Sequence, residues 1–159
     1  MIRTAKTIDR SAVEAIVQEA YKGYVQRIGK PPGPMRDDYA ALIAAGRVSV
    51  IEEPAGTIAG LIVLLPEPDH LLLDNIAVRP ERQGQGLGGR LIAFAEAEAR
   101  RHGYEELRLY THVAMTENIA LYTRIGFVET GRGQQDGYDR VFMTKRLELM
   151  TKRFERDFP

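Results

Sequence analysis

The stretch that decides the fold spans residues 71–101 and reads LLLDNIAVRPERQGQGLGGRLIAFAEAEARR. An apolar segment with strand character is followed by a polar loop, a glycine-rich turn at residues 83–89 and a segment with helical periodicity. Glycines this dense at the start of a helix let a ligand approach the backbone closely. The free N–H groups of a first helical turn, with the helix dipole behind them, favour an anion. The stretch therefore predicts a ligand that carries phosphate.

The composition is that of one globular domain of 159 residues, with 44% apolar residues. Lysine plus arginine and aspartate plus glutamate number 22 each, so the formal net charge is zero. This balance argues against nucleic acid or an anionic membrane as a partner, because both call for a basic surface. The absence of cysteine excludes disulfides, thiolate metal sites and a cysteine nucleophile, and we expect no metal cofactor.

The sequence contains no apolar run of membrane-spanning length and opens without the pattern of a signal peptide. We therefore expect a cytoplasmic protein. Residues 1–147 form the expected domain, and residues 148–159 form a C-terminal tail. Leu147, Met150, Phe154 and Phe158 recur at three- and four-residue spacings in the tail. This spacing predicts either a short amphipathic helix, packed on this chain or on a second copy in a homodimer, or a solvated arm.

Patterns along the chain predict an α/β fold in which a mixed sheet carries helices on both faces. Thr7 or Asp9 caps a helix that has Ile8 among its periodic apolar positions. The breaker-rich residues 24–35 form a loop that either packs over the core edge or is a lid or wall of a substrate pocket. The strand at residues 70–78 reads as buried on both faces and parallel to the strand that begins at residue 106. The remaining expected elements are a strand at 2–6, a helix at 37–46, a hairpin of 47–52 with 57–65, helices at 88–102 and 118–125, and an antiparallel pair at 127–131 and 138–147.

The glycine-rich turn satisfies the dinucleotide fingerprint G-x-G-x-x-G, but its context does not. In that motif the first glycine follows the strand almost directly, whereas residues 79–83 intervene here. The acidic residue expected at the end of the next strand is also missing, because Tyr110, Thr111 and His112 stand there. No Lys-Ser or Lys-Thr pair follows the glycines, which excludes a P-loop.

The same residues resemble the acetyl-CoA motif of the GNAT superfamily of N-acetyltransferases. Gln83, Gly86 and Gly88 form Q-x-x-G-x-G after the strand that ends at residues 75–80. A second block at residues 118–127 agrees, with Asn118 and Tyr122 ahead of a Gly-Phe pair. The resemblance covers nearly the whole chain and implies a GNAT-like acyl-CoA N-acyltransferase fold, a single domain in which the central parallel strands splay apart.

The resemblance implies acetyl-CoA as the co-substrate. Its pyrophosphate would lie on the turn, with Arg82 or Arg90 adding charge or remaining at the solvated surface. Pantetheine would pair with the backbone of Ile76, Ala77 and Val78, and an N–H near Val78 could hold the thioester oxyanion. Coenzyme contacts are thus expected from Ile76, Ala77, Val78, Gln83, Gly84, Gln85, Gly86, Leu87, Gly88, Gly89 and Asn118.

The resemblance also makes Tyr122 the acid that protonates the departing thiolate, with a core tyrosine as the structural alternative. Asn118, which otherwise would cap its helix, lies one turn earlier. The base is less clear, because the positions where many relatives carry a glutamate are not acidic here. His112 is the candidate base, since an imidazole titrates in the right range. Asp74 is expected to be hydrogen-bonded structurally, and a water chain with no dedicated base is the alternative.

These observations predict direct transfer of an acetyl group to a primary amine in a ternary complex. No acyl-enzyme is expected, since the chain lacks cysteine and a serine with a base motif. The acceptor is a small-molecule amine or a peptide amine, entering between residues 21–35 and 131–139. The alternative is a non-catalytic module that binds acyl-CoA for regulation.

Overall fold

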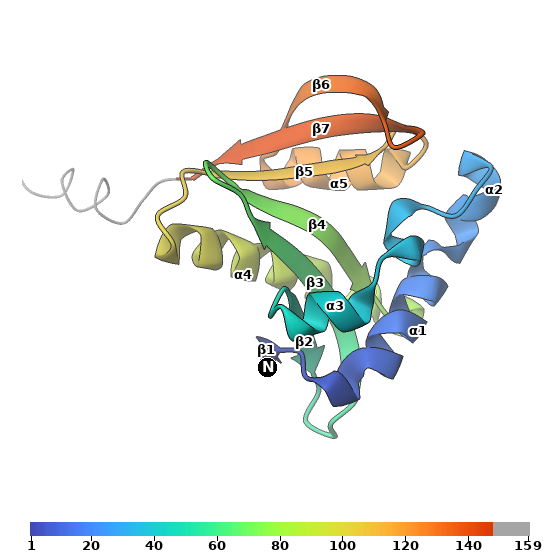
Figure 1. Ribbon diagram of the computed structural model, residues 1–159, viewed down its shortest axis with the longest axis vertical. Helices are drawn as coiled ribbons and strands as arrows, with labels where there is room; N and C mark the ends of the chain where they lie inside the picture. Colours follow the sequence, from blue (N-terminus) through green and yellow to red (C-terminus); the bar gives the residue numbers. More distant parts are fainter. Residues whose placement is uncertain (148–159) are drawn as a thin grey trace, which may run out of the picture. The chain divides into compact units, whose positions relative to one another are not determined.

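The computed structural model describes residues 1–147 and divides into two compact units (Figure 1). The first unit comprises Met1–Leu64 and Asp74–Ala93, and the second comprises Leu65–Leu73 and the chain from Phe94 onward. Within residues 1–147, seven strands form one mixed sheet in the order β1-β2-β3-β4-β5-β7-β6, and strand β4 contributes residues to both units. The predicted α/β class is confirmed.

Strands β1, β2 and β3 of the first unit are antiparallel neighbours, with Arg3 opposite Val50 and Val50 opposite Leu61. The predicted hairpin is therefore present. The strands of this unit are β1 (Ile2–Thr4), β2 (Val48–Glu52), β3 (Ile58–Pro66) and the later part of β4 (Leu71–Val78). Its helices are α1 (Arg10–Tyr21), α2 (Val25–Ile28), α3 (Tyr39–Ala44) and the start of α4 (Leu87–Arg101).

The strand buried on both faces is β3 and not β4, so that expectation was wrong. All of residues 58–63 are buried, whereas β4 alternates between buried and half-buried positions. Asp74 and Ile76 lie on the half-buried face of β4, while Asn75 and Ala77 lie on the buried face. A carboxylate at position 74 is therefore compatible with the strand because its face is not dry.

The N-terminal helix begins later than its apolar pattern predicted. Residues Thr7–Asp9 form a 3₁₀ turn, and Ile8 is 86% exposed, so its expected place in the core was wrong. Asp9 occupies the N-cap position of α1, as predicted, but its side chain makes no cap hydrogen bond to that helix. It accepts hydrogen bonds from the Lys6 N–H at 2.7 Å and from the Arg3 guanidinium at 2.8 Å instead. The Asp9 carboxylate thus holds the start of the helix to Lys6 and to Arg3.

Residues 24–35, which were expected to form a loop, contain short helical elements. Lys22–Tyr24 and Gly33–Arg36 form 3₁₀ turns, and α2 lies between them, ended by Gly29 at a φ of 87°. Helix α3 follows, and the Asp38 carboxylate accepts a hydrogen bond from the Ala41 N–H at 3.1 Å as an N-cap. The 3₁₀ turn Gly33–Arg36 and α3 both lie against α1, within the first unit (Figure 1).

The second unit is built on strands β5 (Glu106–His112), β6 (Val128–Gln135) and β7 (Tyr138–Arg146), together with helix α5 (Thr116–Ile125). Strand β7 pairs antiparallel with both β5 and β6. The β6–β7 turn is tighter than predicted, because β6 runs on to Gln135 and only Asp136 and Gly137, both with positive φ, make the bend. Leu107, Val141 and Met143 of these strands are buried in the core of this unit.

Strand β4 is parallel to β5, as predicted, and the two strands pair over a short length. The register runs from Leu71 opposite Leu107 to Leu73 opposite Leu109, whereas β4 continues to Val78 and β5 to His112. This brief pairing fits the predicted splay of the central parallel strands. The predicted tail helix at residues 148–159 lies outside the described residues.

Candidate active site

The glycine-rich turn opens the 15-residue helix α4. Gly84 and Gly86 have φ values of 80° and 81°, a left-handed conformation that favours glycine. A Cβ added at Gly84, Gly86, Gly88 or Gly89 would meet no atom within 4 Å. The first intrahelical bond runs from the Arg90 N–H to the Gly86 carbonyl at 3.1 Å, so the preceding N–H groups of the first turn face outward. The turn thus offers backbone donors and open space to an anion.

Two arginines, Arg82 and Arg90, lie near this turn, and Arg82 is paired with an acidic side chain. Arg82 is held by Glu53, with its Nε 3.1 Å and its Nη2 3.0 Å from the carboxylate oxygens. Arg90 is exposed at the start of α4. The charge of Arg82 is therefore partly neutralised on the protein, which leaves Arg90 as the better candidate for a phosphate contact.

Strand β4 directs alternate backbone groups to its two edges. The Ala77 carbonyl faces β3 so closely that a Cβ added at Gly60 would lie 2.9 Å from its oxygen. Ile76 and Val78 point their backbone groups to the other edge, because groups of neighbouring residues alternate along a strand. There the Ile76 carbonyl accepts from the Tyr21 hydroxyl at 2.9 Å, and the Val78 carbonyl accepts from Gln83 Nε2 at 3.3 Å. Both carbonyls keep a second lone pair.

A buried polar network adjoins this edge. The Tyr21 hydroxyl lies 2.6 Å from Asn75 Oδ1, and Asn75 Nδ2 donates to the Tyr39 hydroxyl at 2.9 Å. The Tyr39 hydroxyl in turn donates to the Pro34 carbonyl at 2.5 Å. Burial raises the pKa of Tyr39 well above its usual value, and the nearby charges of Asp37 and Asp74 add to this effect. Tyr39 therefore remains a neutral donor. The sequence pointed to none of these roles, although Asn75 is a polar residue in an apolar strand.

Tyr122 lies on α5 and is 6% exposed. Its ring meets Phe127 edge to face at a centroid distance of 5.8 Å. The Phe127 N–H donates to the Tyr122 carbonyl at 3.0 Å, and Gly126 ends the helix at a φ of 113°. The Gly-Phe pair thus fixes the turn of chain that follows Tyr122 and packs against its ring.

Asn118 lies in the first turn of α5, one turn before Tyr122, whereas Met115 occupies the N-cap position. The alternative role of Asn118 as the helix cap is therefore wrong. Its Nδ2 lies 3.6 Å from the Met115 sulfur, and its backbone N–H donates to the Met115 carbonyl at 3.1 Å. The side chain is held in the first turn, and its predicted contact with a coenzyme stays a prediction.

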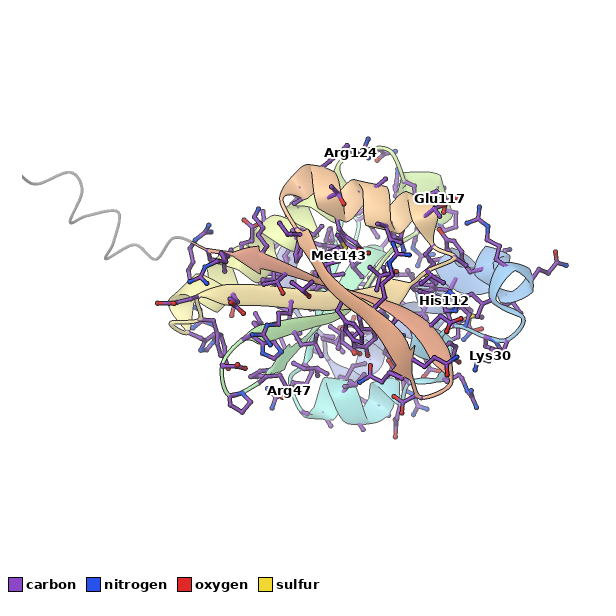
Figure 2. All side chains as sticks on the ribbon, turned by 90° about the horizontal axis from the view of Figure 1, so that it is seen from above. Lys30, Arg47, His112, Glu117, Arg124 and Met143 are labelled. Atoms are coloured by element: carbon purple, nitrogen blue, oxygen red, sulfur yellow. The ribbon has the colours of Figure 1, made fainter. Side chains whose placement is uncertain are left out.

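His112 is the last residue of β5. It lies toward the end of α5 that carries Glu117, and not toward the end that carries Arg124 (Figure 2). Its Nδ1 accepts a hydrogen bond from the Ala114 N–H at 3.0 Å, and its ring meets Tyr138 edge to face at 6.3 Å. An accepting Nδ1 places the proton of the neutral ring on Nε2. The Nδ1 lone pair is engaged by this backbone hydrogen bond, and the role of His112 as the base stays a prediction.

The side chain of Arg140 is a buried cation that sequence reasoning missed. It lies on β7, is 7% exposed, and its guanidinium carbon lies 4.3 Å from the Tyr110 ring centre and 4.9 Å from that of Tyr138. Its Nε is buried and has no hydrogen-bond partner among residues 1–147. Tyr138, Arg140 and Phe142 alternate along β7 and share one face of the strand, a period-two signal that was available in the sequence.

A cavity of about 570 Å³ lies in the second unit beside these aromatic rings. Tyr110 and Phe142, whose ring centres are 6.5 Å apart, form part of its wall. Leu72 adds apolar surface, and Arg108 adds a guanidinium that is paired with Glu106 at 2.7 Å. The cavity therefore has an aromatic wall, and the charge of Arg108 at its edge is neutralised by Glu106.

The described part of the chain contains no cluster of three or more histidine, aspartate or glutamate side chains arranged to hold a metal ion. Within residues 1–147, no helix has both the length and the apolar character needed to cross a bilayer.

The fold is that of solved acyl-transferring enzymes. The ribosomal-protein-S18-alanine N-acetyltransferase from Escherichia coli superposes with a TM-score of 0.73 at 25% identity, covering 94% of both chains. The PaiA N-acetyltransferase from Thermoplasma acidophilum, solved in complex with coenzyme A, gives a TM-score of 0.76 at 20% identity over 92% of this chain and 98% of that one. The sequence model of the acetyltransferase (GNAT) family matches residues 12–127. The chain belongs to this family of acetyltransferase enzymes.

Curated relatives agree over shorter segments. The N-acetyltransferase family 8 member 3 of Rattus norvegicus is 31% identical over 87 residues, and the match spans 51% of this chain but only 38% of that protein. The IAA acetyltransferase of Azospirillum brasilense is 32% identical over 102 residues, covering 62% of this chain and 67% of its own length. The aminoalkylphosphonate N-acetyltransferase of Salmonella typhimurium is 28% identical over 137 residues, covering 81% and 85%.

Proposed function

We propose that this protein transfers the acetyl group of acetyl-CoA directly to a primary amine in a ternary complex. The observation that carries this proposal is the open glycine-rich turn at the start of α4, with Gly84 and Gly86 in the left-handed conformation, in a chain of the acetyltransferase (GNAT) family. Outward N–H groups and unfilled space suit a pyrophosphate, because each donor is fixed before the ligand arrives.

The glycine-rich turn and the edge of β4 proposed to bind the donor belong to the first unit. The turn residues Gln83 to Gly89 would hold the phosphates, and Arg90 would add charge. The edge of β4 formed by Ile76 and Val78 would pair with pantetheine, using its N–H groups and the second lone pairs of its carbonyls. Asn118 of α5 is proposed as a further coenzyme contact.

The transfer itself requires one bond to form and one to break. The lone pair of a neutral amine attacks the thioester carbon, the carbonyl oxygen takes negative charge, and the carbon–sulfur bond then breaks. Tyr122 would give its hydroxyl proton to the departing thiolate. Water is the proposed acceptor of the amine proton, because the hydrogen bond from Ala114 occupies the Nδ1 lone pair of His112.

The acceptor is proposed to be a small amine that also carries an oxyanion. Arg140 supports this choice, since a buried guanidinium with an unpartnered Nε favours a bound anion. The name of the Salmonella typhimurium relative, an aminoalkylphosphonate N-acetyltransferase, is consistent with such a substrate. A peptide amine is the other acceptor class to test.

The test is product analysis with isotopically labelled acetyl-CoA and matched acceptors. We expect 2-aminoethylphosphonate to gain the labelled acetyl group faster than ethanolamine, which presents the same amine without the oxyanion. Equal rates for the two amines would remove Arg140 from acceptor recognition while leaving the acetyl transfer intact. A peptide acetylated in preference to both would replace the proposed acceptor class.

The rival function is a regulatory module that binds acyl-CoA without turnover. It predicts tight binding of acetyl-CoA and no labelled product with any amine of the panel. Residues 1–147 are the proposed domain under either function. A cytoplasmic location and a homodimer remain proposals, to be tested by fractionation and by the mass of the protein in solution.

A further inference from the structure

A continuous path of hydrogen bonds joins the backbone of β4 to the 3₁₀ turn Gly33–Arg36. It runs from the Ile76 carbonyl through the Tyr21 hydroxyl to Asn75 Oδ1, at 2.9 Å and 2.6 Å. It continues from Asn75 Nδ2 to the Tyr39 hydroxyl at 2.9 Å, and from that hydroxyl to the Pro34 carbonyl at 2.5 Å. Side chains alone thus connect two backbone segments that are about forty residues apart in the sequence.

The three side chains of this path are buried. Tyr21, Tyr39 and Asn75 are 8%, 4% and 2% exposed. In such surroundings hydrogen bonds polarise one another, so a change at one end of a chain of bonds alters the strength of the others. The raised pKa of Tyr39 keeps its hydroxyl protonated at ordinary pH, which maintains the bond to Pro34.

The Tyr21 hydroxyl is the point at which the path can respond to a ligand. It has a single hydrogen and two acceptors, the Ile76 carbonyl and Asn75 Oδ1. A ligand amide that donates to the second lone pair of the Ile76 carbonyl makes this oxygen a weaker acceptor for Tyr21, so the tyrosine hydrogen shifts toward Asn75. A more strongly polarised Asn75 amide is a better donor to Tyr39, and Tyr39 becomes a better donor to Pro34.

We propose that Asn75, Tyr21 and Tyr39 are positioning residues, through which pairing of the coenzyme along the edge of β4 orders the turn Gly33–Arg36. The inference rests on the proposed function, since it takes coenzyme A as the molecule that pairs with Ile76. The segment that contains this turn was expected from sequence to border the acceptor. Binding of the donor would then prepare the wall of the acceptor site.

Hydrogen exchange measured by mass spectrometry tests the proposal on the full chain, with coenzyme A as the probe. The Met35 amide reports on the turn because it closes it with a 3.0 Å bond to the Pro32 carbonyl. Saturating coenzyme A should slow exchange in a peptide covering residues 30–39 by about five-fold or more in the wild type, the lower end of ordinary coupling between sites. Tyr39→Phe should bind coenzyme A yet lose this protection.

The control is Tyr104→Phe. Tyr104 also donates its hydroxyl to a backbone carbonyl, that of Glu67 at 2.8 Å, but it lies outside the path. This variant should keep the protection by coenzyme A, which separates loss of the path from loss of one buried hydroxyl. Tyr21→Phe serves as a second variant that interrupts the path and should behave like Tyr39→Phe.

Two results would overturn the inference. Coenzyme A that binds the wild type without slowing exchange at residues 30–39 would show that the path transmits nothing. Full protection in Tyr39→Phe would show that another route orders the turn. A wild-type protein that gives no calorimetric signal with coenzyme A would instead contradict the proposed function, so the two failures are distinguishable.

Discussion

Tyr122 is the residue on which the proposed chemistry depends most directly. Tyr122→Phe removes the hydroxyl and keeps the ring that packs against Phe127 at 5.8 Å. We expect kcat to fall by about 10²- to 10⁴-fold, the usual contribution of a positioned acid, while the Kd for acetyl-CoA changes little. Steady-state kinetics and calorimetry measure the two quantities. An unchanged kcat would assign Tyr122 to the core alone.

Gly86 tests the phosphate cradle. Gly86→Glu adds a side chain and a negative charge at a position whose surroundings are open, so we expect binding of coenzyme A to be lost. Gly56→Glu is the matched control, because Gly56 also has a positive φ, 91°, and open surroundings in a hairpin turn. Calorimetric titration of both variants with coenzyme A measures this binding. Binding that survives in Gly86→Glu would place the cradle elsewhere.

Some residues of the candidate site could be predicted from the sequence, and others could not. The glycine pattern predicted the turn at the start of α4 because glycine has few other reasons to cluster there. Arg140 was not predicted as a site residue, since its burial arises from Tyr110 and Tyr138, which lie on different strands. The hydrogen bond from Ala114 to His112 likewise depends on local geometry that composition does not encode.

At the scale of elements, the close approach of β3 and β4 depends on Gly60. A Cβ at this position would lie 2.9 Å from the Ala77 oxygen, so the strands must move apart to admit it. We expect Gly60→Ala to lower the free energy of unfolding by about 1–3 kcal/mol. Gly23→Ala, where a Cβ meets nothing within 4 Å, should change it by less than about 0.5 kcal/mol. Urea unfolding measures both, and equal effects would refute the close approach.

The N-terminal ion pairs make the stability of the first unit depend on pH. Hydrogen bonds from Arg3 lower the pKa of Asp9 and that of Glu52 in the folded state. A lowered folded pKa gives stability that is present above the unfolded value, about 3.9 for aspartate and 4.3 for glutamate, and is lost as pH falls through the folded value. We therefore expect acid destabilisation below about pH 4.

Arg3→Met tests the origin of this pH dependence. The variant should be less stable than the wild type at pH 7, and the difference should shrink as the pH falls below about 4. Chemical unfolding at several pH values measures the difference. A constant gap between the two proteins across this range would assign the effect of Arg3 to packing instead of charge.

Elements with strong periodicity were predicted well, and short ones were not. The hairpin β2–β3, helix α4 and the parallel arrangement of β4 and β5 follow from patterns that span many residues. The 3₁₀ turns and α2 within residues 22–36 were missed because prolines and glycines mark a break without specifying its conformation. The alternation of buried and half-buried positions along β4 could not be seen in the sequence, because its half-buried face also carries apolar residues.

For the whole molecule, membership of the acetyltransferase (GNAT) family follows from two motifs at the right separation and from the match over residues 12–127. The donor half of the proposed site could be predicted from sequence because a glycine-rich turn before a helix has a direct physical meaning. The proposed acceptor half could not, because the burial of Arg140 between the rings of Tyr110 and Tyr138 arises only in the fold.

The measurement that tests the central claim most directly is calorimetric titration of the wild-type chain with acetyl-CoA and, separately, with NAD. We expect a single site for acetyl-CoA and no heat with NAD, because the turn at residues 83–89 is separated from its strand by residues that the dinucleotide motif lacks. Binding of NAD with no binding of acetyl-CoA would contradict the account.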